Sequence, residues 1–260
     1  MPELPEVETV VRSLAPRLTG RRILSARFTS RFVTPGNRNK LAAKIAGRTI
    51  ETVRRRGKFI LFALDAGALA VHLGMTGKLL LDGVVTPHTH GVFELDRGVL
   101  LYDDPRQFGR IEWGSTRAER LGPEPLEIGL KEFTARVRRR KTRMKALLLN
   151  QTFLAGMGNI YVDEALFTAG IHPLAIASRL SAPRVARLHQ AIREILTLAI
   201  EHRGSSISDY VDAEGQRGGF QLLHRVYGRE GEPCAHCGGA IRKMVVAGRG
   251  THYCPKCQRR

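Results

Sequence analysis

The apolar positions at the start of the chain recur with the spacing of an α-helix. They are Leu4, Val7, Val10, Val11 and Leu14. Residues three and four positions apart share one face of a helix, and proline is tolerated in the first turn, where Pro5 stands. We therefore expect the chain to open with an amphipathic helix that ends before Gly20.

From Ile23 to Trp113 the pattern changes to short apolar segments separated by turn residues. Such segments are typical of antiparallel strands joined by tight turns. The clearest ones are Lys58–Asp65, Ala68–Leu73, Gly77–Leu81, Val92–Leu95 and Val99–Tyr102. The sequence therefore predicts an antiparallel sandwich or barrel of roughly a hundred residues.

Prolines and glycines at 122–129 mark a second change, after which apolar residues follow a helical period. Helices are expected over Lys145–Gln151 and Ile160–Ala169, on either side of the turn Gly156–Asn159. A long amphipathic helix is expected to follow Ser181, which can cap it. The last segment, from residue 232 onward, is too short for a core of its own and requires a covalent or metal staple.

The charge of the chain indicates a polyanionic partner. It has 42 Lys and Arg residues against 24 Asp and Glu residues, a net charge of +18, and 43% of its residues are hydrophobic. The densest basic clusters are Arg136–Lys145, Arg54–Arg56 with Lys58, and Arg242, Lys243 and Arg249. Separate clusters favour nucleic acid, because each neutralised phosphate releases a condensed counterion. A merely solvated basic face is the alternative, and a membrane-surface helix is disfavoured because the basic run lacks an opposing apolar face with aromatic anchors.

The length of the apolar runs argues against a membrane protein. The longest are short, such as Phe59–Leu64, whereas a span requires roughly 18 to 20 residues. The start of the chain, Met1–Glu6, carries acids and prolines where a secretory signal has a basic head and an apolar stretch. We therefore expect a cytoplasmic location and no membrane partner.

All four cysteines lie in the last segment, in two pairs with two residues inside each pair and sixteen between the pairs. They are Cys234, Cys237, Cys254 and Cys257. This spacing is typical of a tetrahedral zinc site, and a reducing cytosol disfavours the alternative of disulfides. Four thiolates leave the metal no open position, so one zinc ion is expected to be structural.

The amino terminus carries candidate chemistry. Proline at position 2 permits removal of Met1, which would expose a secondary amine beside the Glu3 carboxylate. A secondary amine that attacks a sugar carbon gives an iminium that cannot lose its charge at nitrogen, and such an iminium is a good electron sink for elimination. The plain alternative is that Pro2 and Pro5 only start a helix.

Six motifs, in order along the whole chain, resemble those of bacterial formamidopyrimidine-DNA glycosylases, the 8-oxoguanine repair enzymes. They are Met1–Thr9, His72–Gly77, Asp104–Gly109, Leu121–Leu126, Gly158–Tyr161, and the cysteine hairpin with Gly248–Thr251. The resemblance implies an α+β multidomain fold: an N-terminal antiparallel β-sandwich with a leading helix, a helix–two-turn–helix domain, and a C-terminal zinc-finger β-hairpin. DNA would lie in the cleft between the halves. We place the domains at 1–118, 131–225 and 226–260, with a linker at 119–130.

The resemblance also assigns catalytic roles. It makes Pro2 the nucleophile at C1′ of a damaged nucleotide and Glu3 the acid that helps to open the sugar. It makes Lys58 the proton donor in β-elimination and Arg249 the residue that holds the phosphate for δ-elimination. The implied protein is a monomeric glycosylase and AP lyase that excises 8-oxoguanine and formamidopyrimidines from double-stranded DNA.

The same resemblance implies DNA contacts. Those to the backbone are His72, Arg140, Asn159 and, in a loop that matches less well, His88. Met75, Arg106 and Phe108 match a wedge that fills the gap left by a flipped base, although both apolar residues could instead belong to a core. The loop 215–220 resembles one that closes over the flipped base. The chain departs from the family at Gln107, where a second arginine is common.

Two other functions stay open at this point. Endonuclease VIII relatives, which act on oxidised pyrimidines, share the fold and chemistry but usually have glycine where this chain has Leu4. A non-catalytic binder of damaged DNA would keep the scaffold without the reaction, and the presence of Pro2, Glu3 and Lys58 argues against it.

Overall fold

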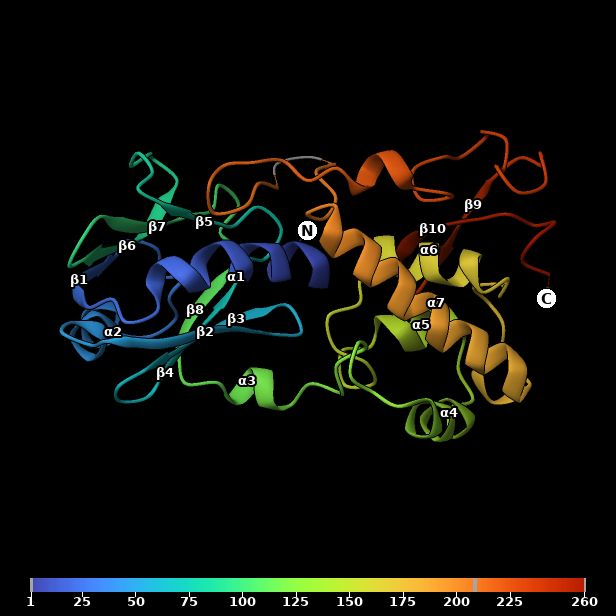
Figure 1. Ribbon diagram of the computed structural model, residues 1–260, viewed down its shortest axis with the longest axis horizontal. Helices are drawn as coiled ribbons and strands as arrows, with labels where there is room; N and C mark the ends of the chain where they lie inside the picture. Colours follow the sequence, from blue (N-terminus) through green and yellow to red (C-terminus); the bar gives the residue numbers. More distant parts are fainter. Residues whose placement is uncertain (1, 208–209, 260) are drawn as a thin grey trace. The chain divides into compact units, whose positions relative to one another are not determined.

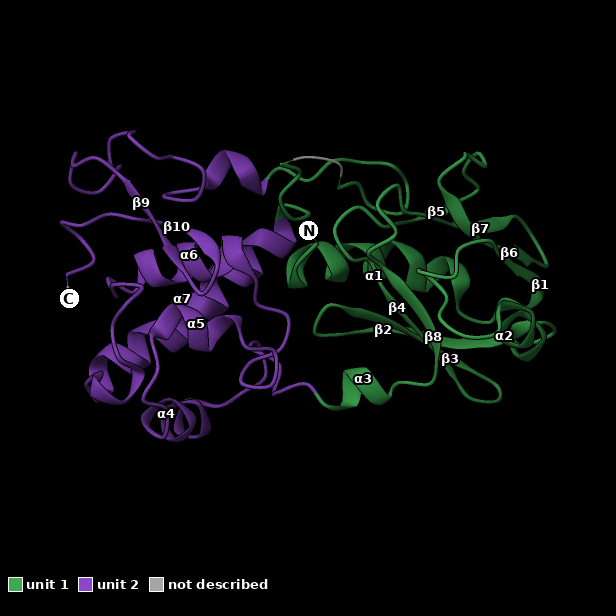
Figure 2. Ribbon diagram, turned by 180° about the vertical axis from the view of Figure 1, so that it is seen from behind, with its two compact units in different colours: residues 1–120, 202–219 green, residues 121–201, 220–260 purple. Residues whose placement is uncertain are grey.

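Two units make up the structure, a computed structural model that describes residues 2–207 and 210–259. Unit 1 contains residues 1–120 and 202–219, and unit 2 contains residues 121–201 and 220–260 (Figure 2). Within the described residues, none of the helices combines the length and the apolar character that crossing a bilayer demands.

Unit 1 begins with the expected helix, α1 (Leu4–Leu18). Its apolar stripe, which includes Val7, Val10 and Leu14, is buried in the core of the unit. The helix packs on two strands of one sheet, β2 and β3, beside which it runs in Figure 1. The helical period seen in the sequence is therefore the period of burial.

Two four-stranded antiparallel sheets follow in unit 1, as predicted (Figure 1). One sheet has the order β1-β6-β7-β5, with β1 Ile23–Phe28, β5 Lys78–Leu81, β6 Thr89–Leu95 and β7 Val99–Asp103. The other has the order β2-β3-β4-β8, with β2 Ile50–Arg56, β3 Phe59–Leu64, β4 Ala68–His72 and β8 Arg110–Trp113. Side chains of both sheets, among them Phe62, Leu69, Phe93 and Leu100, line the same interior space. The unit is therefore a sandwich and not a barrel.

The sequence pattern did not reveal two helices of unit 1, α2 (Arg38–Ile45) and α3 (Thr116–Glu119). Helix α2 buries only Leu41 and Ile45, and two apolar residues four apart are too few for a recognisable period. Its start is set by Asn37, whose side chain accepts a hydrogen bond from the Lys40 N–H at 2.9 Å.

The predicted domain 131–225 includes residues 202–219, but in the structure these residues belong to unit 1. The Ser205 N–H donates to the Glu6 carboxylate at 2.7 Å, and the Leu81 N–H donates to the Ala213 carbonyl at 3.2 Å. Within the segment, the Asp212 carboxylate accepts from the N–H groups of Glu214 and Gln216. Polar anchoring of this kind leaves no hydrophobic period by which the sequence could assign the segment. The other predicted boundaries stay a prediction.

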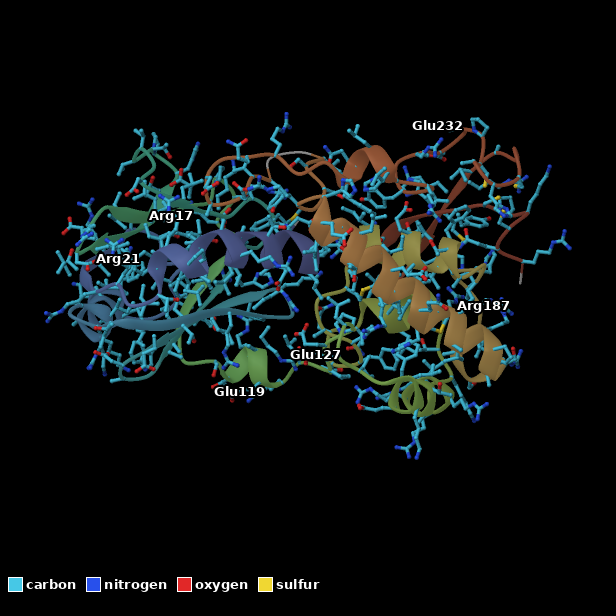
Figure 3. All side chains as sticks on the ribbon, in the orientation of Figure 1. Arg17, Arg21, Glu119, Glu127, Arg187 and Glu232 are labelled. Carbon is cyan, nitrogen blue, oxygen red and sulfur yellow. The ribbon has the colours of Figure 1, made fainter. Side chains whose placement is uncertain are left out.

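Unit 2 contains the three expected helices and one that was not expected. They are α4 (Leu130–Arg138), α5 (Met144–Leu149), α6 (Asn159–Thr168) and α7 (Ala182–Glu201), with 3₁₀ turns η1 (Ala177–Arg179) and η2 (Phe220–Leu223). Helix α6 is buried on nearly every side and packs against α5 and α7. Helix α7 is amphipathic, and Arg187, labelled in Figure 3, lies on its exposed face. Only α4, which buries just Phe133 and Val137, had not been predicted.

The last segment folds as an antiparallel hairpin, β9 (Arg242–Val246) and β10 (Arg249–Tyr253), in which Arg249 pairs with Val246. Its small apolar cluster consists of Phe167 from α6 together with Val226, Cys234, Ile241 and Cys254. This cluster is too small to hold a fold alone, which confirms the need for a staple.

Gly109, which directly precedes β8, permits a close approach that we expect to be required for stability. A Cβ there would stand 1.6 Å from the Tyr102 hydroxyl and 2.7 Å from the His72 carbonyl oxygen, in a region where Tyr102 is fully buried. We predict that Gly109→Ala lowers the free energy of unfolding by roughly 1–3 kcal/mol, the usual cost of overpacking.

The control is Gly129→Ala, because Gly129 has φ −74° and nothing within 4 Å of its added Cβ. Chemical denaturation of both variants measures the difference. Equal stability of the two would show that the sandwich relaxes around Gly109 without cost.

Candidate functional site

Pro2 and Glu3 lie buried immediately before α1, with Glu3 at the N-cap position. Their position is set by the buried Glu6 side chain, which accepts from the Glu3 N–H at 2.8 Å and from the Ser205 N–H at 2.7 Å. Gly204 makes room for this carboxylate, since a Cβ there would stand 2.6 Å from Glu6 Oε1. The amino terminus is therefore held by buried hydrogen bonds, while Met1 lies outside the described residues.

Lys58 lies in the turn between β2 and β3 and is buried, with a relative exposure of 7%. The turn is braced by Arg55, which donates to the Glu8 carboxylate at 2.9 Å and to the Gly57 carbonyl at 3.2 Å. Because Glu8 is on α1, this ion pair ties the Lys58 turn to the helix that carries Pro2 and Glu3.

His72 ends β4 and pairs with Phe59 at the start of β3, so it lies beside the Lys58 turn. Its ring centroid is 5.0 Å from that of Phe59. Burial, and then the positive charges of Lys58, Arg117 and Arg110, lower the pKa of His72 to about 4. Its Nδ1 accepts the Gly74 N–H at 3.0 Å. The ring is therefore neutral at pH 7 with its proton on Nε2, which leaves a donor for a phosphate oxygen.

The three predicted wedge residues are on the surface. Met75 and Phe108 are 37% and 52% exposed, which excludes the alternative that they belong to the core. Arg106 is also exposed, and its guanidinium carbon lies 4.6 Å from the centroid of the Phe108 ring. A guanidinium group is attracted to the face of an aromatic ring. The Arg106 and Phe108 side chains therefore hold each other in place at the surface.

The Asp104 carboxylate joins the two loops that carry these residues. Fully buried, it accepts from the Thr76 hydroxyl at 2.6 Å and from the Gly109 N–H at 2.8 Å. The Tyr102 hydroxyl donates to it at 3.4 Å. Sequence reasoning missed this role, although Asp104 opens one of the motifs, because spacing alone does not show which acid is buried.

Gln107 and His88 also attach to this region. The Gln107 backbone has φ +53°, and its side-chain Oε1 accepts from the Ser30 hydroxyl at 2.6 Å. His88 is exposed, and its carbonyl accepts the Asp104 N–H at 2.9 Å. The predicted DNA contact at His88 stays a prediction.

The basic run of unit 2 is only partly a surface feature. Arg139, Arg140 and Lys141 line an open groove of about 490 Å³. Lys145, which the sequence analysis counted in the basic cluster Arg136–Lys145, is fully buried and forms an ion pair with the buried Asp163 at 2.7 Å. Removing two charges from water costs free energy, which is offset only by good geometry and further hydrogen bonds. We therefore interpret Lys145 as a residue that holds the fold together.

The finger hairpin is fastened to α5 and α6 by polar bonds. Lys145 Nζ and the Asn159 side-chain amide donate to the Gly250 carbonyl at 3.1 and 2.9 Å. Asp163 also accepts the His252 N–H at 2.8 Å. Asn159 and Gly250, the residue next to Arg249, are thus brought together. The sequence analysis missed Asp163, because the sequence of an apolar helix does not show which residues an acid within it will contact.

Glu164, next on α6, binds the segment that precedes the finger. Its carboxylate accepts from the N–H groups of Arg225, Val226 and Tyr227 at 2.8–3.0 Å. Burial raises the pKa of Glu164, although these three donors oppose that effect.

The four cysteine sulfurs lie within 4.8 Å of one another. The Cys234–Cys257 and Cys237–Cys254 Sγ distances are 3.9 and 3.4 Å. Zinc–sulfur bonds of about 2.3 Å in a tetrahedron require sulfurs about 3.8 Å apart, and a disulfide requires about 2.05 Å. The donor set therefore fits one structural zinc ion, held by Cys234, Cys237, Cys254 and Cys257.

Family models match almost the whole chain. The formamidopyrimidine-DNA glycosylase N-terminal domain matches residues 1–111, the formamidopyrimidine-DNA glycosylase H2TH domain residues 121–211, and the zinc finger found in FPG and IleRS residues 231–260. The chain belongs to the formamidopyrimidine-DNA glycosylase family. It is accordingly a DNA glycosylase of base excision repair, and the resemblance seen in its motifs is confirmed.

Individual relatives agree along the full length. Formamidopyrimidine-DNA glycosylase of Solibacter usitatus is 57% identical over all of both chains, and that of Chloroflexus aggregans is 47% identical over 99% of this chain and 98% of the relative. The crystal structure of MutM (Fpg) from Thermus thermophilus superposes with a TM-score of 0.90 at 43% identity, over 99% of this chain and 98% of that one. A Lactococcus lactis Fpg mutant in complex with Fapy-dG-containing DNA gives 0.91 at 39%, over all of both chains.

We predict that Cys237→Ser releases the zinc ion and unfolds the finger hairpin, because three thiolates and a small apolar cluster cannot hold it. Unit 1, which has its own core, is expected to keep its structure. Metal content by atomic absorption, with NMR of the β9–β10 region and of unit 1, measures both effects. Retention of one zinc ion per chain would contradict the assignment.

The lowered pKa of His72 predicts a pH dependence of stability. Below pH 6.5 the His72 side chain takes up a proton in the unfolded chain, whereas in the folded chain it takes one up only near pH 4. The contribution of neutral His72 to the free energy of unfolding is therefore fully present above pH 6.5 and is lost as pH falls towards 4. Unfolding by urea at several pH values should show His72→Gln with a shallower loss than the parent between those limits. Identical slopes would exclude an imidazole whose pKa is lowered in the folded chain.

Proposed function

We propose that this glycosylase excises oxidised purines, 8-oxoguanine and formamidopyrimidines, with Pro2 as a covalent nucleophile, and then cleaves the abasic strand by β,δ-elimination. The observation that carries the proposal is the buried placement of Pro2 and Glu3 at the head of α1 by the Glu6 carboxylate. A nucleophile must be held in a fixed position to gain the advantage of proximity.

In the first step, the Pro2 amine attacks C1′, the bond between C1′ and the base nitrogen breaks, and the proton that the amine loses leaves on the base. Glu3 gives a proton to the ring oxygen, so that the C1′–O4′ bond opens and the nitrogen electron pair forms the iminium. The iminium of a secondary amine keeps its positive charge and draws electrons towards C1′. This step requires removal of Met1, because only a terminal proline has a free amine.

In the second step, loss of a C2′ proton breaks the C3′–O3′ bond, and loss of a C4′ proton then breaks the C5′–O5′ bond. We assign proton donation in the first elimination to Lys58, whose buried turn is tied to α1 through Arg55 and Glu8. Arg249 holds the phosphate that leaves in the second. Water hydrolyses the remaining iminium and restores the Pro2 amine.

The DNA contacts of the proposal use groups whose chemistry suits phosphate. His72 offers a neutral Nε2–H, and Arg140 lines a basic groove. Asn159 and His88 are further backbone contacts, while Met75, Arg106 and Phe108 fill the gap left by the flipped nucleotide. The partner is double-stranded damaged DNA, and we propose a monomeric enzyme that works in the cytoplasm on the nucleoid.

Borohydride reduction of the reaction on 8-oxoguanine DNA tests the nucleophile. The parent should give a covalent complex joined at Pro2, located by mass spectrometry of its N-terminal peptide. Pro2→Gly should lose most of the trapping, whereas Lys58→Ala should still trap but cleave the strand about 100-fold more slowly or worse, the usual effect of one proton-transfer group. If Pro2→Gly traps as well as the parent and Lys58→Ala does not, the nucleophile is Lys58.

A further inference from the structure

A groove of unit 1 lies between an edge strand and a helix. Strand β8 is the outermost strand of its sheet, and Ile111 and Trp113 on it line one wall of the groove. Lys40, Leu41 and Lys44 of helix α2 line the other wall, and the volume is about 350 Å³. All of these residues belong to unit 1 (Figure 2). Edge strands that face a groove can accept an extended peptide as an additional strand.

The outer edge of β8 has backbone hydrogen-bonding groups that β4 does not use. The Gly114 N–H donates to the Ala68 carbonyl at 2.7 Å. Because alternate residues of an antiparallel pair bond to the partner strand, the N–H and C=O groups of Ile111 and Trp113 point away from β4. The Val33 carbonyl accepts the Ile111 N–H at 2.8 Å. Within the described residues, no hydrogen bond occupies the Trp113 N–H or carbonyl, so both can pair with another chain.

The helix wall of the groove is positively charged. Lys40 and Lys44 are exposed and four residues apart, so they lie on the same face of α2. In the part of the chain that the structure describes, neither ammonium group forms an ion pair. Glu112, which also lines the groove, already pairs with Arg117 at 3.1 Å. The groove therefore attracts a ligand with negative charge.

The strand wall carries the ring of Trp113, the single tryptophan of the chain. The ring is half-buried and is held from two sides. Lys44 Nζ lies 5.4 Å from its centroid, and a Cβ at Gly67 would stand 2.4 Å from its Cζ2 atom. Leu41, which is 8% exposed, provides apolar surface on the helix side. A ring in a fixed position offers a large contact area with little further loss of side-chain freedom on binding.

We propose that this groove binds an extended, acidic segment of a partner protein as an additional strand beside β8. The backbone of the segment pairs with Trp113, its carboxylates lie near Lys40 and Lys44, and an apolar side chain contacts the Trp113 ring. Nucleic acid fits less well, because a phosphate backbone has only acceptors and cannot pair with both the donors and the acceptors of a strand edge. Apolar strands without acids are disfavoured, because lysines at an edge oppose their pairing.

The proposed segment and DNA contact different parts of β8. Arg110, at the start of the strand, pairs with His72, one of the proposed DNA contacts, whereas Trp113 pairs with Leu69. Three residues of a strand span about 10 Å. A partner bound at Trp113 therefore leaves the residues of the proposed reaction accessible, and it can hold the glycosylase while the glycosylase holds DNA.

A peptide of alternating glutamate and valine residues tests the groove. The full chain is first saturated with a duplex that carries a tetrahydrofuran abasic analogue, so that the basic DNA site cannot capture the acidic peptide. Fluorescence anisotropy of the fluorescein-labelled peptide measures its affinity. The emission of Trp113, titrated with the unlabelled peptide, reports whether binding occurs at the groove. We expect saturable binding and a shift of this emission to shorter wavelength, because the peptide excludes water from the ring.

Two changes separate strand pairing from charge. A peptide with the same side chains but N-methylated at alternate amides keeps its charge and loses strand hydrogen bonds, so its affinity should fall about 10-fold. Lys44→Glu should lower the affinity of the unmodified peptide about 10-fold, because a repulsion replaces an attraction. Lys131→Glu, which makes the same change at an exposed lysine of α4, is the matched control and should have no effect.

Other outcomes would overturn the proposal. Equal affinity of the N-methylated peptide would show that no strand is added. Equal weakening by Lys44→Glu and Lys131→Glu, or an absence of saturable binding or of a change in Trp113 emission, would show that the groove does not hold the peptide. Displacement of the peptide by a single-stranded oligonucleotide that causes the same change in Trp113 emission would identify the groove as a contact for nucleic acid.

Discussion

The Asp104 carboxylate is the group on which the arrangement of the wedge depends. It lies at the end of one sheet and collects the Thr76 hydroxyl, the Gly109 N–H and the Tyr102 hydroxyl. Met75 stands next to Thr76, and Arg106 and Phe108 stand between Asp104 and Gly109, so one buried acid fixes three exposed side chains from two loops. Burying a carboxylate costs free energy unless its oxygens accept hydrogen bonds. The donors around Asp104 must therefore stay in place, and this requirement favours a single arrangement of the two loops.

Buried carboxylates also hold other parts of the candidate site in place. Glu6 joins the amino terminus to residue 205, Asp163 joins α6 to the finger hairpin, and Glu164 binds the segment at 225–227. Asp163 accepts the N–H of His252 in strand β10, whereas Glu6 and Glu164 accept N–H groups from segments that have no regular structure to satisfy them. Such segments cannot pair in a sheet, so acids within rigid helices replace the missing partners.

Elements with a strong period could be predicted from the sequence, and polar anchors could not. The helix at Leu4–Leu18, the strands of the sandwich and the zinc ligands follow from spacing alone, because burial and metal geometry repeat at fixed intervals. Lys145 looked like part of a surface cluster, since nothing in the sequence reveals that Asp163 meets it in the core. The attachment of residues 202–219 to unit 1 was hidden for the same reason: it depends on individual hydrogen bonds.

The buried acids also change the surface that DNA would meet. Among the described residues, eight carboxylates are buried against two lysines, Lys58 and Lys145; the acids are Glu3, Glu6, Asp103, Asp104, Glu124, Asp163, Glu164 and Asp212. The exposed part of the chain is therefore more positive than its net charge of +18. Acids that hold loops in place thus do not weaken the field that attracts a polyanion. One distribution of charge therefore has two effects. The buried acids hold the loops in place, and because they are not on the surface, the basic residues there attract a polyanion without opposition from them.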